Sequence, residues 1–127
     1  MNYILDTHVL LWSMFESHKL SKTAEQILLD STCHKFISIT SMWEISIKNR
    51  IGKLPLPNGI SDVFDEVGRS GYGIIGIERS YIEHFTSLPL LHRDPFDGII
   101  ISTAILEQMT IVTTDVNIQK YTVPWVW

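Results

Sequence analysis

Four acidic residues lie far apart in the sequence but at equivalent places relative to the predicted strands and helices. Asp6 and Asp115 directly follow short apolar runs that are typical of buried strands, Asp97 lies in the first turn of a predicted helix, and Glu44 lies one turn into another. Because the carboxyl ends of parallel strands meet at one edge of a sheet, we expect these carboxylates to lie close together. Their mutual repulsion favours a hard divalent cation, Mg²⁺ or Mn²⁺, between them. Such an ion polarises a phosphate and lowers the pKa of bound water, so the pattern indicates metal-dependent chemistry on phosphates.

The segment from His92 to Asp97 is typical of the start of a buried helix. Asp94 is a favourable N-cap residue, and Pro95 suits the first helical position, where no amide donor is needed. Asp97 then falls at the third position, where a carboxylate faces the positive end of the helix dipole. The run at 99–106 is apolar on nearly all sides, so we expect this helix to pack against a sheet.

Short apolar runs alternate with helical segments along the whole chain. We expect strands at 3–5, 36–39, 74–77, 110–114 and 123–127, and helices at 7–15, 20–29, 42–50, 61–69, 79–88 and from 95 onward. Thr40 or Ser41 is expected to cap the helix at 42–50, and Pro124 to confine the last strand to an edge of the sheet. This alternation predicts one α/β domain over residues 1–127, with a parallel sheet covered by helices on both faces.

The composition is that of a globular domain without a membrane segment. The chain has 127 residues, 45% of them hydrophobic, and no apolar run long enough to span a bilayer. The N-terminus lacks the basic region of a signal peptide, and Cys33 is the only cysteine, so we expect a cytoplasmic protein without an intrachain disulfide. The formal charge of −4 argues against binding nucleic acid by electrostatics alone, but it permits a nucleic-acid enzyme because bound cations neutralise carboxylates.

Each acidic residue also has an ordinary structural explanation. Asp6 could be only the N-cap of the next helix, Asp115 only a turn residue, and Asp97 only a partner of the helix dipole. Glu44 could pair with Lys48 one helical turn later, for about 0.2–0.5 kcal/mol. We favour a single acidic site, because four independent structural roles on one sheet edge are harder to explain than one shared function.

The other residues that could do chemistry form weaker patterns. The five histidines show no metal-ligand spacing with one another or with Cys33, which disfavours a zinc site. Trp12, Trp43 and Phe96 are expected in the core rather than as platforms for stacked bases. The only dense basic cluster could contact an RNA backbone or simply form a solvated helix end. It comprises Lys48, Arg50 and Lys53.

Several motifs taken together resemble the PIN-domain ribonucleases, and specifically the VapC-like toxins of bacterial toxin–antitoxin modules. They are Ile4–His8, Ser38–Lys48 with Gly52–Leu54, His92–Asp97, and Val112–Asp115 followed by Tyr121. Each fragment alone is weak, but their order and spacing are specific, and the resemblance covers essentially the whole chain. It implies a three-layer α/β/α sandwich with a mostly parallel sheet of four to five strands.

The resemblance also implies an activity, a site and partners. Such proteins are endoribonucleases that depend on Mg²⁺ or Mn²⁺, usually form homodimers and are silenced by a cognate antitoxin. The positions that match the family's catalytic, metal-holding acids are Asp6, Glu44, Asp97 and Asp115. Thr7 and Ser41 match supporting polar positions beside the first two acids. Gly98 departs from the family, because relatives commonly carry arginine there.

Two other functions stay open from the sequence. A non-catalytic interaction module could keep the same fold, although the presence of all four acids disfavours decay of the site. A phospho-receiver has a similar length, a parallel sheet and an acidic Mg²⁺ pocket. It needs adjacent acids after its first strand and a lysine after its last, whereas Asp6 has no acidic neighbour and residues 123–127 contain no lysine.

Overall fold

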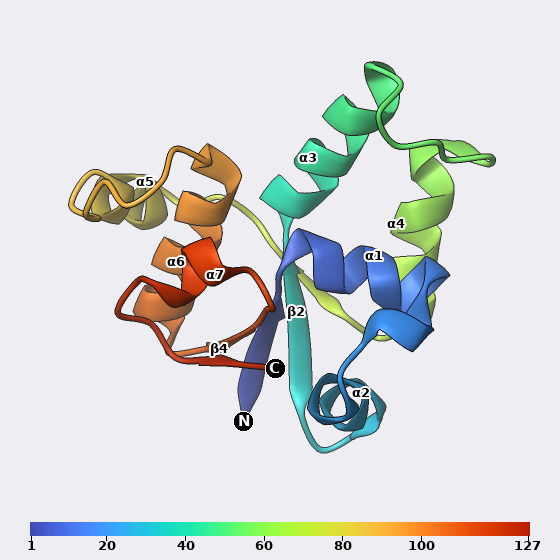
Figure 1. Ribbon diagram of the computed structural model, residues 1–127, viewed down its shortest axis with the longest axis horizontal. Helices are drawn as coiled ribbons and strands as arrows, with labels where there is room; N and C mark the ends of the chain where they lie inside the picture. Colours follow the sequence, from blue (N-terminus) through green and yellow to red (C-terminus); the bar gives the residue numbers. More distant parts are fainter.

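The protein is built around a sheet of five parallel strands. The computed structural model describes all residues from Met1 to Trp127. The strands lie in the order β3-β2-β1-β4-β5 (Figure 1). They are β1 (Asn2–Leu5), β2 (His34–Ser38), β3 (Gly73–Ile75), β4 (Thr110–Val112) and β5 (Trp125–Val126). The chain adds β2 and β3 on one side of β1, and β4 and β5 on the other, so the strand order reverses between β1 and β4. In open α/β sheets, ligands bind at such a reversal, outside the carboxyl ends of the strands.

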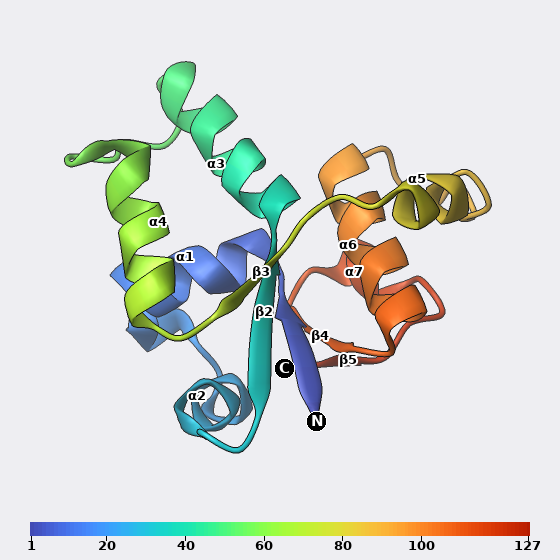
Figure 2. The ribbon, with the colours of Figure 1, turned by 180° about the vertical axis from the view of Figure 1, so that it is seen from behind.

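Helices cover both faces of the sheet and complete three layers (Figures 1 and 2). One layer contains α1 (Thr7–Phe15), α2 (Lys22–Leu29), α3 (Ile39–Arg50) and α4 (Gly59–Arg69). The opposite layer contains α5 (Arg79–Phe85), α6 (Pro95–Glu107) and α7 (Val116–Gln119). A short 3₁₀ helix, Ser17–Lys19, joins α1 to α2. The predicted α/β class and three-layer sandwich are confirmed, with every strand pair parallel.

Alternating strand residues supply two separate cores. Leu5 and Val112 point into the core beneath α1–α4, whereas their neighbours Ile4 and Ile111 point into the core beneath α6 and α7. All four side chains are fully buried. Complete burial of such a side chain stabilises the fold by about 1.5–3 kcal/mol. The central strands are therefore fixed from both sides, and so are the residues that follow them at the carboxyl edge.

β2 passes directly into α3, which differs from the expected boundary. β2 ends at Ser38, and α3 begins at Ile39 rather than at residue 42. Ser38 is the N-cap, because its Oγ accepts a hydrogen bond of 3.1 Å from the Thr40 N–H. The prediction that Thr40 or Ser41 caps this helix is therefore wrong, and both lie buried within its first turn.

The helix predicted at 7–15 has those bounds in the structure, whereas several other predicted elements have shifted ends. α2 begins at Lys22 after the cap Ser21, α4 begins at Gly59, and α5 ends at Phe85. β3 and β4 are shorter than predicted, and β5 is an edge strand directly after Pro124, as expected.

Two further expectations fail against the structure. Trp43 is not in the core, because 57% of it is exposed on a face of α3 that also exposes Ile51. The strand order 3-2-1-4-5 also differs from the flavodoxin-like order 2-1-3-4-5 that receiver domains share, so the phospho-receiver alternative is wrong. No helix has the length and apolar character needed to cross a membrane.

Candidate active site

Asp6 lies between β1 and α1 at the reversal of the sheet. It is the N-cap of α1, because its Oδ1 accepts a hydrogen bond of 3.1 Å from the His8 N–H. Its Oδ2 accepts a hydrogen bond of 2.7 Å from the Thr113 hydroxyl. Only 2% of the residue is exposed. Burial raises the pKa of Asp6 above its usual value, and the bonds from Thr113 and His8 oppose this rise.

Thr113 joins the loops that carry Asp6 and Asp115. While its hydroxyl donates to Asp6, its Oγ1 accepts a hydrogen bond of 2.9 Å from the Asp115 N–H. Asp115 in turn caps α7 by accepting a hydrogen bond of 2.8 Å from the Asn117 N–H. Thr113 was not predicted from the sequence to be part of the site. Its position two residues before Asp115 was the available signal, since a threonine there can bond to that backbone.

Glu44 lies on α3 and is held by the two supporting residues and by Lys48. Thr7 Oγ1 lies 2.9 Å from Glu44 Oε1 and 2.9 Å from Ser41 Oγ. Because a hydroxyl has one proton and an ionised carboxylate only accepts, the Thr7 hydroxyl donates to Glu44 when that acid is ionised. Lys48 Nζ donates to Glu44 Oε2 at 2.8 Å. The structure therefore brings Thr7 and Ser41 into the network around the second acid.

Asp97 lies in the first turn of α6, in the position predicted for it. Asp94 caps this helix by accepting from the N–H groups of Phe96 and Asp97, at 2.9 and 3.2 Å. The Asp97 side chain faces the carboxyl edge of the sheet, and its Oδ2 lies 3.0 Å from His92 Nε2. His92 is therefore a second residue beside the acids, after Thr113, whose role was not predicted from the sequence.

The pKa of Asp97 reflects burial and the negative charges around it. Its pKa rises to about 8, chiefly because of burial, and then because of the negative charges of Asp94, Asp6, Asp115 and Glu44. Lys48 is bonded to Glu44, and the acidic edge therefore carries more negative than positive charge. An excess of buried negative charge is the setting in which a bound cation is most strongly favoured.

The donor atoms fit a hard divalent cation. All are carboxylate oxygens, which suit Mg²⁺ and Mn²⁺. No protein donor contacts Oδ1 of Asp97 or Oδ2 of Asp115, and one oxygen of each therefore has both lone pairs available. Across the chain, no three His, Cys, Asp or Glu side chains are already gathered closely enough to form a ligand set. The four carboxylates are therefore not preassembled as a ligand set, and each is held by its own protein partner.

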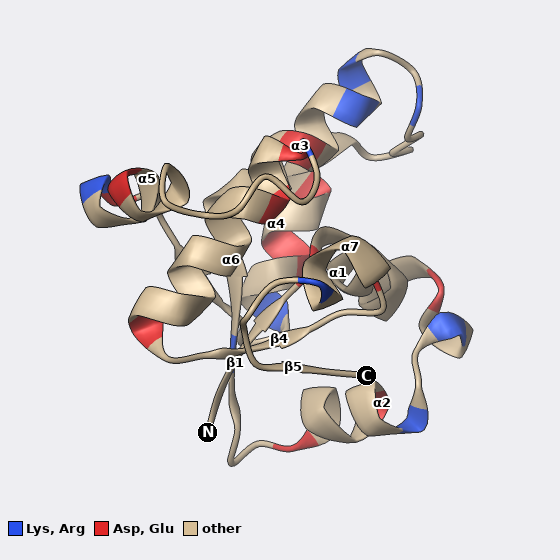
Figure 3. Ribbon diagram, turned by 60° about the vertical axis from the view of Figure 1, so that its left-hand side comes forward, with Lys and Arg blue, Asp and Glu red and all other residues tan.

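The basic cluster lies beside this edge, at the end of α3 and in the loop after it (Figure 3). Lys48 is paired with Glu44, whereas Arg50 is exposed. Lys48 and Lys53 both line a cavity that also reaches Glu44, Asp94 and Phe96. Two of the three expected RNA-contacting residues, Lys48 and Lys53, therefore lie close to Glu44.

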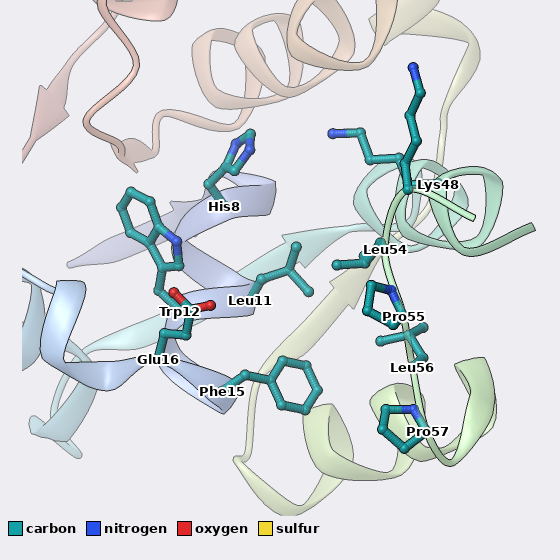
Figure 4. Close-up of a pocket in the computed structure, with 11 residues that line it drawn as sticks. His8, Leu11, Trp12, Phe15, Glu16, Lys48, Leu54, Pro55, Leu56 and Pro57 are labelled. Atoms are coloured by element: carbon teal, nitrogen blue, oxygen red, sulfur yellow. The ribbon is translucent and has the colours of Figure 1, made fainter. Parts of the chain in front are cut away.

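An apolar groove of about 570 Å³ opens next to the acidic edge, between α1 and the loop after α3 (Figure 4). Leu11 and Phe15 of α1 face Leu54 and the proline-containing loop across it. His8 and the basic residues Lys48 and Lys53 line its polar end. The groove lies within reach of the acids, because His8 follows Asp6 closely and Lys48 bonds Glu44.

Gly98 has a clear structural reason to be glycine in this chain. A Cβ at this position would collide with the ring of Phe85, which packs onto α6 from α5. The arginine of relatives would therefore require the Phe85 ring to move. Beside this contact, a cavity of about 520 Å³ is lined by Phe85, Gly98, His92 and Tyr121 among others.

A parallel sheet with this strand order and acids at its reversal is an α/β fold of the PIN type. The PIN domain family model matches residues 3–123, and the chain belongs to this family. No curated protein matches the chain significantly.

Several solved structures share the fold. VapBC2 from Rickettsia felis, bound to a DNA fragment from its promoter, is 20% identical with a TM-score of 0.75, covering 99% of this chain and 98% of that one. DNA-bound VapBC from Salmonella typhimurium is 14% identical with a TM-score of 0.73, covering 99% and 97%. VapBC-1 from nontypeable Haemophilus influenzae is 18% identical with a TM-score of 0.67, covering 99% and 97%.

Proposed function

We propose that this protein is a divalent-metal-dependent endoribonuclease that acts as the toxin of a toxin–antitoxin pair. The observation that carries the proposal is the convergence of Asp6, Glu44, Asp97 and Asp115 at the sheet reversal, where their charges help raise the pKa of Asp97 to about 8. Membership of the PIN family and the similarity to VapBC structures support it.

The carboxylates would hold the ion, and the chain's other groups would orient them. Asp6, Glu44 and Asp97 would hold Mg²⁺ or Mn²⁺ directly or through water, and Asp115 would complete the site or support a second ion. When bound, the ion would polarise the scissile phosphate of RNA and lower the pKa of a water nucleophile. Thr113 and Thr7 hold the side chains of Asp6 and Glu44 in defined orientations at this edge.

The test is cleavage of total bacterial RNA, with 5′ ends mapped, by protein freed of any antitoxin. We expect discrete cuts with Mg²⁺, none with chelator, and a loss of at least roughly 100-fold for Asp6→Asn, more than removal of an outer-shell partner causes. Equal cutting by wild type and variant would overturn the proposal. Absence of cuts by folded wild-type protein with Mg²⁺ and with Mn²⁺ would instead favour the non-catalytic interaction module.

The antitoxin is the partner we propose for the apolar groove beside α1. Its apolar lining suits the apolar side chains of an antitoxin segment, and Lys48 and Lys53 at its polar end suit an acidic residue. A segment in this groove would lie next to Glu44 and Asp6, so it could block access of RNA to the acids.

A homodimer is the assembly we propose for the toxin itself. Trp43 on α3 and Ile51, the residue directly after α3, are both more than half exposed, and neighbouring large exposed apolar side chains favour association. Sedimentation of wild type and Trp43→Ser tests this assembly. We expect a dimer for the wild type and a shift toward monomer for the variant, whereas a monomeric wild type would contradict it.

A further inference from the structure

His92 lies between the acidic edge and the core. Its Nε2 is 3.0 Å from Asp97 Oδ2, and its Nδ1 is 2.8 Å from the Tyr121 hydroxyl. The side chain of His92 is only 12% exposed. The rings of His92 and Tyr121 also contact each other edge to face, with centroids 5.4 Å apart. Two hydrogen bonds and a ring contact therefore fix both the position and the plane of the imidazole.

The partners of His92 determine which nitrogen carries the proton when Asp97 is ionised. A carboxylate only accepts, so Nε2 must donate to Asp97. In a neutral ring Nδ1 then has no proton, and it accepts from the Tyr121 hydroxyl. The Asp97 carboxylate therefore sets the tautomer, and the Tyr121 hydroxyl, which can donate or accept, donates to Nδ1 of that tautomer.

Tyr121 can act as a fixed anchor because it belongs to the core. It lies after α7 and packs with Ile4 and Ile111 in the core beneath α6 and α7. The χ2 torsion of an aspartate such as Asp97, in contrast, has a broad distribution of values when no partner restrains it. A bond from a rigid donor to one oxygen restrains this torsion and leaves the other oxygen, Oδ1, without a protein partner.

We propose that His92 is a positioning residue for the metal site, and that it aims Oδ1 of Asp97 at the ion by holding Oδ2. Tyr121 supports it by a hydrogen bond to Nδ1 and a ring contact that hold the plane of the imidazole. Groups that orient ligating side chains in this way commonly contribute roughly 10- to 100-fold to metal affinity. This inference rests on the proposed metal-dependent activity, because it assigns His92 a role at that site.

The structure offers a matched control in His84. Its Nδ1 lies 3.0 Å from Ser102 Oγ, so it makes the same kind of bond to α6 from the same layer. It does not contact any of the four acids. If His92 only stabilises the start of α6, then His92→Leu and His84→Leu should both lower Tm, and neither should change the affinity for the metal ion.

The experiment is a Mn²⁺ titration followed by the EPR signal of free Mn²⁺, together with Tm of the metal-free protein and RNA-cleavage kcat and KM. We expect Kd for Mn²⁺ to rise roughly 10- to 100-fold in His92→Leu, with partial recovery in His92→Gln, whose amide can still donate. Tyr121→Phe should raise Kd by about the lower end of that range, and His84→Leu should leave it unchanged. The kinetic loss in His92→Leu should fall on kcat at low Mn²⁺ and shrink as Mn²⁺ is increased.

The outcomes separate this inference from the proposed function. Suppose that the wild type binds Mn²⁺ tightly and that Kd for Mn²⁺ in both His92→Gln and Tyr121→Phe is within twofold of the wild-type value. That result would overturn the positioning role, even if His92→Leu did not fold. An equal loss of affinity in His84→Leu would also overturn it. Failure of the wild type to bind Mn²⁺ would overturn the proposed function, and this inference with it.

Discussion

At the residue scale, each proposed ligand also has an ordinary structural role. Asp6 and Asp115 are N-caps, and Glu44 pairs with Lys48. These roles do not compete with a shared site, because a cap after a parallel strand necessarily lies at the carboxyl edge of the sheet. The same side chain can therefore serve as a helix cap or ion-pair partner and also belong to the proposed acidic site.

The charge of Asp97 should make the metal-free protein less stable as pH rises. Its pKa is about 8 in the folded protein against a usual value of 3.8. Between these values the folded state holds a proton that the unfolded state has lost, so the free energy of unfolding falls with increasing pH. Asp97→Asn should flatten this slope and should be more stable than the wild type near the upper value. Urea unfolding of both proteins in chelator, at several pH values across this range, measures the difference, and parallel slopes would contradict it.

The hydroxyl of Thr113 should matter for stability as well as for the site. Thr113→Val keeps the shape but removes both the donor to Asp6 and the acceptor for the Asp115 N–H. Because Asp6 is buried, we expect a loss of about 1–3 kcal/mol in the free energy of unfolding. Denaturant unfolding measures it, with Thr86→Val on the exposed end of α5 as the control. A change no larger than the control's would show that Thr113 does not hold the two loops together.

At the element scale, the features predictable from sequence were those set by neighbouring residues. Asp94 and Pro95 begin α6 as expected, because an N-cap and a first-turn proline act locally. The start of α3 was not predictable in the same way, since Ser38, Thr40 and Ser41 are all acceptable caps. The pairing of β2 with its neighbours decides among them, and it ends the strand at Ser38.

The supporting residues Thr113 and His92 could not be predicted from the sequence for a similar reason. Thr113 bonds a residue at the other end of the chain, and α6, β4 and α7 separate His92 from Tyr121 in the sequence. Pairings over such separations depend on tertiary structure, which residue spacing does not encode. The acids themselves were accessible, because the ends of strands and the starts of helices leave local signals.

The packing of α5 on α6 should depend on Gly98 and Phe85 together. Replacing glycine by alanine inside a helix usually stabilises by about 1 kcal/mol. In this protein, Gly98→Ala should destabilise, because the new Cβ meets the Phe85 ring. In the Phe85→Ala background the same change should stabilise. A double-mutant cycle in urea measures the coupling, which we expect to be about 1–3 kcal/mol, and additive effects would show that the ring simply moves aside.

At the scale of the whole molecule, the strand order places the site and leaves a groove beside it. The reversal between β1 and β4 brings Asp6 and Asp115 together, while α3 and α6, on opposite faces, bring Glu44 and Asp97 to the same edge. A protein with a formal charge of −4 can bind RNA at such an edge only when cations offset the carboxylates. The overall charge therefore favours the proposed metal dependence, as the acidic site does.

The apolar groove should be needed for inhibition of the toxin by its antitoxin, but not for RNA cleavage. Phe15 lines the groove, is half exposed and lies away from the four acids. Phe15→Asp should weaken antitoxin binding by at least roughly tenfold, since burying an unpaired charge in an apolar interface is costly. RNA cleavage by the free variant should equal that of the wild type. Calorimetric titration with the antitoxin, beside a cleavage assay, measures both, and unchanged neutralisation would place the antitoxin elsewhere.

The measurement that tests the central claim most directly is Mn²⁺ binding by antitoxin-free protein, with wild type compared with Asp97→Asn. The account predicts saturable binding to the wild type, a rise in Tm with Mn²⁺ concentration, and loss of both in the variant, although the variant without metal is at least as stable. Identical binding by the two proteins, or none by a folded wild type, would contradict the claim that these carboxylates form one cation site.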